Sequence, residues 1–144
     1  MDPTQLARTP VRIAASSLPP PIVSYRDGAW VLEAAYGYDD VGTRLTVPAG
    51  FRFDLASVPR LFWPLVAPFE LSIAAPLLHD FLYRHAGAPP PGAALPARRY
   101  ARRDADRLFR EVMAAEGVAA WRRYAAWAAA RAFGAPSWGR PAPA

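Results

Sequence analysis

The residues of this chain best suited to chemistry are a histidine, a tyrosine and two aspartates in its second half. His79, one of two histidines, is followed directly by Asp80 and four residues later by Tyr83. Residues four apart share one face of a helix, so the imidazole and the phenol can point at a common target. Asp106 lies on the apolar side of the next predicted helix and needs an internal hydrogen-bond partner there. His79 and Tyr83 can both donate to it, which leaves the second imidazole nitrogen as a general base near neutral pH.

The same groups allow two other interpretations. A buried His–Tyr–Asp network can simply tie two helices together. Alternatively, Ser57 could act as a nucleophile with His79 and Asp106. The chain has no Gly-x-Ser-x-Gly elbow, however, and Ser57 is also a good helix N-cap. The residues alone do not decide whether this network is a catalytic site or a structural brace that ties two helices together.

Asp80 lies on a different part of the helix from His79 and could bind a hard cation such as Ca²⁺ through its carboxylate. Asp54 and backbone carbonyls of residues 50–57 are the candidates to complete that metal site. Asp80 could instead interact with Arg84 or the helix N-terminus, and Asp54 could be an ordinary loop hydrogen-bonder. Two histidines and no cysteine leave too few ligands for a His-rich zinc site.

Two aromatic segments could form an interfacial surface. One contains Phe62 and Trp63 within a very apolar stretch. The other is a predicted helix that carries Trp121 and Tyr124 beside several arginines. Aromatic residues next to arginine suit a phospholipid boundary or a protein partner, although such residues more often belong to a core and its rim.

The composition indicates one globular domain of 144 residues with a formal net charge of +5. This charge favours anionic partners such as phospholipid head groups or nucleic acid, and it also fits an ordinary basic surface. No nucleic-acid-binding motif accompanies it, so specific base readout is not expected. The absence of cysteine excludes disulfides and thiolate chemistry. We find no signal-peptide pattern and no apolar run near the ~20 residues of a membrane span, which predicts a soluble protein.

The elements that must position these residues are strands in the first half of the chain and helices in the second. Asp27-Gly28 between two apolar runs signals a hairpin, and Asp39-Asp40-Val41-Gly42 predicts a second turn. The predicted strands cover 22–25, 30–36 and 43–47. The predicted helices cover 77–85, 99–116 and 118–133, with a shorter helix between Pro59 and Pro64. Residues 87–96 are predicted to form a Pro- and Gly-rich loop. The fold class is therefore α+β, a small antiparallel β-meander followed by a bundle of three to four helices. We expect an irregular arm over 1–21, one domain over 22–138 and a loose tail over 139–144.

Three motifs stand out along the chain, Gly50–Pro59 (GFRFDLASVP), His79–Tyr83 (HDFLY) and Ala105–Phe109 (ADRLF), and they are continued by Met113, Gly117-Val118 and Arg131–Gly134 (RAFG). In these motifs the chain resembles the family called domain of unknown function 1353. The resemblance covers residues 28–138. It implies a small protein of tailed bacteriophages or prophages without an established activity, with virion or tail proteins as partners. Such a protein would be made in the bacterial host cytoplasm, with association to the virion as a further expectation.

A second resemblance, at the level of motifs, is to the small bacterial and fungal phospholipases A2. His79, Asp80, Tyr83 and Asp106 match their pattern in order and type. In that family the matching histidine activates water, the adjacent aspartate binds Ca²⁺, and the distant aspartate with the tyrosine orients the histidine. This chain departs from the pattern because it has no Gly-rich calcium loop with cysteines, so residues 50–57 would have to replace that loop.

Two hypotheses follow. In the first, a phage-type accessory protein hydrolyses an ester, such as that of a lipid. His79 is then the base, Asp106 and Tyr83 orient it, and the two candidate metal-binding aspartates hold a cation. In the second, a non-catalytic structural or assembly protein uses the same network to brace its helices, and the segment 62–63 docks on a partner.

Overall fold

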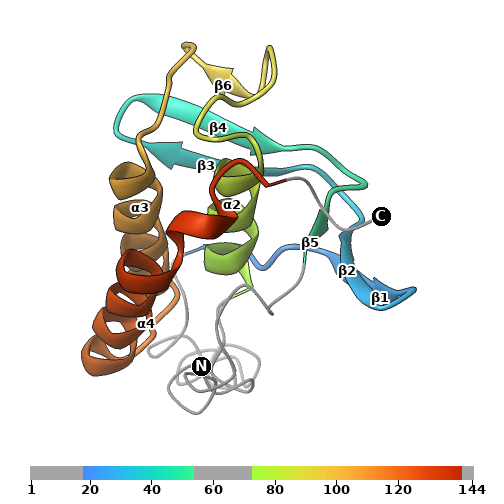
Figure 1. Ribbon diagram of the computed structural model, residues 1–144. Helices are drawn as coiled ribbons and strands as arrows, with labels where there is room; N and C mark the ends of the chain where they lie inside the picture. Colours follow the sequence, from blue (N-terminus) through green and yellow to red (C-terminus); the bar gives the residue numbers. More distant parts are fainter. Residues whose placement is uncertain (1–17, 54–72, 141–144) are drawn as a thin grey trace, which may run out of the picture.

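The computed structural model describes residues 18–53 and 73–140 (Figure 1). Strands form its N-terminal side, and three α-helices with a short 3-10 turn follow, which confirms the predicted α+β class. Several predictions fall outside the described residues. These are most of the arm, the short helix between Pro59 and Pro64, and the four candidate site residues Asp54, Ser57, Phe62 and Trp63.

The first sheet has the antiparallel order β1-β2-β5, with β1 at Val23–Arg26, β2 at Ala29–Leu32 and β5 at Arg52–Phe53. Asp27 and Gly28 join β1 to β2, and both have positive φ angles, 52° and 80°. Positive φ at both central residues is the requirement of a type I′ turn, which Asp-Gly meets well. The predicted hairpin is confirmed.

The second sheet has the order β3-β4-β6, with β3 at Tyr36–Asp40, β4 at Thr43–Val47 and β6 at Ala94–Leu95. The prediction of one continuous strand over 30–36 is wrong, because the chain leaves β2 after Leu32 and begins the next sheet at Tyr36. The prediction that 87–96 is only a loop is also incomplete. Its two-residue strand β6 pairs with β4, and a strand of that length has no detectable periodicity.

Three helices follow: α2 at Ala74–Arg84, α3 at Arg102–Ala115 and α4 at Ala120–Phe133; the 3-10 turn η3 spans Ala135–Ser137. α3 packs against both α2 and α4. α2 begins two residues before Pro76, which then lies in the first turn, where its missing N–H removes no intrahelical hydrogen bond. Within the described residues, none of the helices has the length and apolar character needed to cross a membrane.

α2 is the central element of the core. Its buried residues belong to one hydrophobic cluster with residues of both sheets and of α3, and the largest fully buried side chains include Leu32, Leu45, Phe53, Leu77, Leu78, Phe81, Leu82, Leu108 and Met113. Because α2 is held on several sides, the rotamers of its side chains are fixed by packing. His79 and Tyr83 are thus presented from a rigid helix.

Candidate functional site

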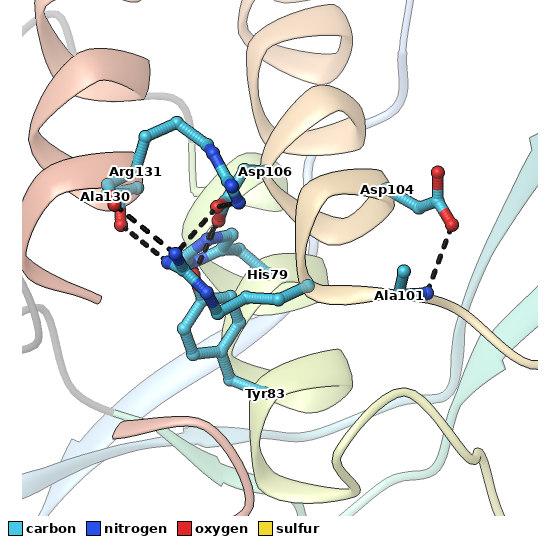
Figure 2. A network of polar contacts seen from close by, with 8 residues as sticks. His79, Tyr83, Ala101, Asp104, Asp106, Ala130 and Arg131 are labelled. Atoms are coloured by element: carbon cyan, nitrogen blue, oxygen red, sulfur yellow. Dashed lines mark hydrogen bonds and ion pairs between the residues drawn. The ribbon is translucent and has the colours of Figure 1, made fainter. Parts of the chain in front are cut away.

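The structure brings His79, Tyr83 and Asp106 together between α2 and α3 (Figure 2). The imidazole Nε2 of His79 lies 2.7 Å from Asp106 Oδ1. The hydroxyl of Tyr83 donates to the same oxygen at 2.6 Å. The two donors are four residues apart on α2, and the acceptor comes from α3, as the spacing of the sequence predicts.

Two arginines complete the network around Asp106. Arg131, near the end of α4, donates from Nη1 to Asp106 Oδ2 at 2.8 Å. Arg102, one turn before Asp106 on α3, places Nη1 3.5 Å from the same Oδ2 and 3.3 Å from the hydroxyl of Tyr83. It also donates to the carbonyl oxygens of Ala130 and Arg131, at 3.1 and 3.3 Å. One carboxylate therefore links all three helices.

The sequence interpretation did not identify these two arginines as members of the network. A signal existed for Arg102, because an arginine four residues before an aspartate on a helix is a common ion pair. For Arg131 the sequence contained no such signal, since this residue lies 25 residues after Asp106 on a separate helix. It is, however, the first residue of the Arg131–Gly134 segment that carries part of the family resemblance.

Asp106 is completely buried. Burial raises the pKa of its carboxyl group, but the hydrogen bonds from His79, Tyr83 and Arg131 outweigh that effect and hold the pKa below its ordinary value. The carboxylate is therefore ionised and can only accept hydrogen bonds. At 2.7 Å from it, His79 Nε2 must carry a hydrogen, so the neutral imidazole has its lone pair on Nδ1.

The imidazole of His79 is held between two aromatic rings. Its centroid lies 4.2 Å from that of Tyr83 and 4.4 Å from that of Phe109. Its side chain is 11% exposed. No hydrogen bond to Nδ1 is found among the described residues. This is the arrangement of an oriented base whose second nitrogen has no partner among the described residues.

Tyr83 is fixed by the chain that follows α4. Gly134 leaves room for its hydroxyl, because a Cβ at that position would lie 2.7 Å from the phenolic oxygen. The ring of Trp138 packs edge-on against it with centroids 5.0 Å apart, and Gly139 N donates to the carbonyl of Tyr83. Burial and the hydrogen bond to Asp106 raise the pKa of Tyr83, so it remains a protonated phenol that donates.

Asp80 points to a different partner. Its carboxylate forms an ion pair with Arg84 at 3.0 Å, the alternative that the sequence left open. In the part of the chain that the structure describes, no three histidine, aspartate or glutamate side chains are grouped as a metal site would require. Asp54 lies outside that part, so the Ca²⁺ site of Asp80 and Asp54 stays a prediction, and none of the chemistry below depends on a cation.

A second buried carboxylate, Asp40 at the end of β3, gives a useful contrast. It is 2% exposed and accepts a hydrogen bond from Arg98 at 2.9 Å, with Arg107 3.7 Å away. The sequence placed Asp40 in a turn, but it is the last residue of a strand. No histidine is among the partners of Asp40 in the described residues, so this pair braces the fold without offering a base.

The fold and the site define an α+β protein built around a buried His–Tyr–Asp–Arg network. The model of the family described as "Protein of unknown function (DUF1353)" matches residues 30–130, and the chain belongs to this family. The family resemblance seen in the sequence is confirmed.

One relative is the uncharacterized protein y4jT of Sinorhizobium fredii (strain NBRC 101917 / NGR234), whose sequence is 30% identical to this chain over 110 residues. The match covers 74% of this chain and 29% of the relative, so the chain spans less than a third of that protein's length. No solved structure matches. Neither the family model nor this relative supports the resemblance to phospholipases A2.

Proposed function

We propose that this protein is a hydrolase in which His79 activates a water molecule for attack on an ester. The observation that carries the proposal is the 2.7 Å contact of His79 Nε2 with an ionised, fully buried Asp106, which leaves Nδ1 as the free base. Tyr83 and Arg131 hold that carboxylate in place, so the imidazole has one orientation and one tautomer.

In this reaction Nδ1 of His79 takes a proton from water while the water oxygen attacks the ester carbonyl carbon. The resulting imidazolium is stabilised by Asp106 through Nε2–H. It then returns the proton to the alkoxide leaving group as the carbon–oxygen bond breaks, which yields a carboxylic acid and an alcohol. The two arginines moderate the charge of Asp106, which limits how strongly the imidazolium is stabilised.

The second candidate function is the non-catalytic one, a structural or assembly protein. It is favoured by Arg102, whose guanidinium ties the last carbonyls of α4 to the same network. The phage or prophage setting, with virion or tail proteins as partners, belongs to both candidates as a prediction.

His79→Gln separates the two candidates. A glutamine places an N–H donor where Nε2 was, so it can still bond Asp106, but it has no atom to replace the basic Nδ1. We expect near-normal stability and a loss of hydrolysis of about 10²–10⁴-fold, the usual contribution of general base catalysis. His85→Gln is the matched control, because His85 follows the same helix and packs on Phe81 rather than on Asp106.

The assay uses a chromogenic p-nitrophenyl ester and phosphatidylglycerol vesicles, each with added CaCl₂ and with EDTA. The proposal holds if the wild type and His85→Gln hydrolyse either substrate and His79→Gln does not. It fails if the purified wild type hydrolyses neither, or if His79→Gln retains the activity. In that case, a large drop in melting temperature for Asp106→Ala would support the brace. The EDTA arm tests the Ca²⁺ prediction separately.

A further inference from the structure

α4 exposes aromatic side chains on the side that faces away from the core. Trp121 and Tyr124, three residues apart and therefore on one face, are 58% and 50% exposed, whereas only Ala126 and Ala129 of this helix are buried. In Figure 1, α4 lies on the outer side of α3, away from the sheets. The exposed residues that continue this face as a stripe along the helix, Ala128 and Ala132, are apolar too, so both the inner and the outer face of α4 are apolar. A helix face of this kind is expected to meet an apolar medium.

Arginines border this stripe. Arg110 from α3 stacks over Tyr124 and Trp127, with its guanidinium carbon 5.2 and 5.0 Å from the ring centroids. Arg122 and Arg123 stack over Trp121 and Tyr124 in the same way, at 5.0 and 5.7 Å. α4 contains no acidic residue. The stripe is therefore apolar along its centre and cationic along its edges.

From this arrangement we infer that the outward face of α4, defined by Trp121, Tyr124, Ala128, Ala132 and the bordering Arg110 and Arg123, docks on an anionic phospholipid surface. The aromatic rings would enter the boundary between head groups and acyl chains, and the guanidinium groups would contact lipid phosphates. α4 has 14 residues and is therefore about 21 Å long, which suits a helix lying in the plane of the surface.

A phospholipid surface explains both features of the face better than an acidic protein does. An acidic protein would match the arginines, but it gives no reason for an apolar stripe along the whole helix. A second copy of the chain would bury the aromatic rings, but it would also place the arginines of the two copies against each other, and like charges repel. The positive net charge of +5 adds long-range attraction to an anionic membrane.

The test is cosedimentation with vesicles of phosphatidylcholine alone and of phosphatidylcholine mixed with phosphatidylglycerol, at low and high salt. The double variant Trp121→Ala/Tyr124→Ala removes the apolar part, and Arg110→Gln/Arg123→Gln removes charge. Tyr25→Ala is the matched control, because Tyr25 is 62% exposed but lies on β1. All variants are made in the His79→Gln background, so that binding is measured without turnover and the failure of hydrolysis is a separate result.

We expect salt-sensitive binding to the phosphatidylglycerol vesicles that Tyr25→Ala retains. The aromatic double variant should lower the partition coefficient roughly tenfold or more, and each arginine removed should lower it about fivefold. Absence of binding overturns the inference, as does equal binding by the aromatic double variant or salt-independent binding to phosphatidylcholine alone. A dimer in solution that depends on Trp121, seen by light scattering without vesicle binding, would overturn it in favour of self-association.

Discussion

Asp106→Asn preserves the shape of the central side chain and removes its charge, which makes it the most demanding test of the network. In the wild type His79 and Tyr83 donate to Oδ1 while Arg131 donates to Oδ2. An asparagine has one acceptor oxygen, so its amide nitrogen must face a donor on one side. The guanidinium of Arg131 cannot accept a hydrogen bond, whereas imidazole and phenol can, so the amide nitrogen should face His79 and Tyr83. The imidazole must then accept at Nε2 and carry its hydrogen on Nδ1, which removes the base.

The expected losses can be estimated for each readout. A comparable inversion of the histidine tautomer in a serine protease triad lowers kcat by about 10⁴, and we expect a loss of at least about 10³ here. Removing one partner from a buried ion pair costs about 3–5 kcal/mol of unfolding free energy. With the amide nitrogen toward His79 and Tyr83, the asparagine oxygen still accepts from Arg131, so we expect a value near the lower limit, about 3 kcal/mol.

The matched control is Asp40→Asn, which removes the charge of the other buried carboxylate. Its arginine partners are similarly placed, so the unfolding free energy should fall by a comparable amount, measured by urea denaturation. Ester hydrolysis should stay within about twofold of the wild type once the fraction folded is considered, because no base depends on Asp40. Nitrogen NMR shifts of the His79 ring report the tautomer directly.

Two results would refute this reasoning. One is an Asp106→Asn protein that hydrolyses the ester at the wild-type rate. The other is a wild-type spectrum in which His79 carries its hydrogen on Nδ1 rather than on Nε2. Equal loss of activity in the Asp40 and Asp106 variants would show that activity follows stability alone.

Three further predictions concern the same network. Tyr83→Phe removes a hydrogen bond to an ionised carboxylate and should lower the unfolding free energy by about 1.5–3 kcal/mol in urea denaturation. Gly134→Ala places a Cβ 2.7 Å from the hydroxyl of Tyr83 and should cost about 1–3 kcal/mol in the same assay. Gly37→Ala should cost clearly less, since its Cβ meets only the exposed, movable guanidinium of Arg44. Finally, the pKa of Asp106 is below its ordinary value of 3.8, so its contribution to stability is complete above that pH and is lost as the pH falls through the lowered pKa. Asp106→Asn should therefore reduce the acid dependence of the unfolding free energy between neutral pH and about pH 3.

The hairpin, the three helices and the meeting of His79, Tyr83 and Asp106 could all be predicted because each depends on a local pattern. Asp27-Gly28 determines its turn through backbone conformation alone, and the four-residue spacing of His79 and Tyr83 places both on one helix face. Asp106 was predicted as their target because a carboxylate on an apolar face needs buried donors.

The missed features depend on contacts between distant segments. The apolar run Trp30–Tyr36 contains no turn residue, so its division between two sheets could not be seen in the sequence. β6 is a strand only because β4 pairs with it. The sequence predicts a turn at Asp40 because of the nearby Gly42. Its burial could not be predicted, because it depends on a hydrogen bond from Arg98, 58 residues later in the chain.

The two arginines bear on whether the network is a catalyst or a brace. A carboxylate has about four lone-pair positions, and in the absence of His79 the groups Tyr83, Arg102 and Arg131 would still provide it with donors from all three helices. The brace is therefore nearly complete without an imidazole, and the space beside Phe109 would suit an aliphatic side chain. A histidine there adds what the brace does not need, an oriented ring whose Nδ1 has no hydrogen-bond partner in the described part of the chain. This is why near-normal stability of His79→Gln, combined with loss of hydrolysis, is the result that would distinguish a catalytic site from a structural one.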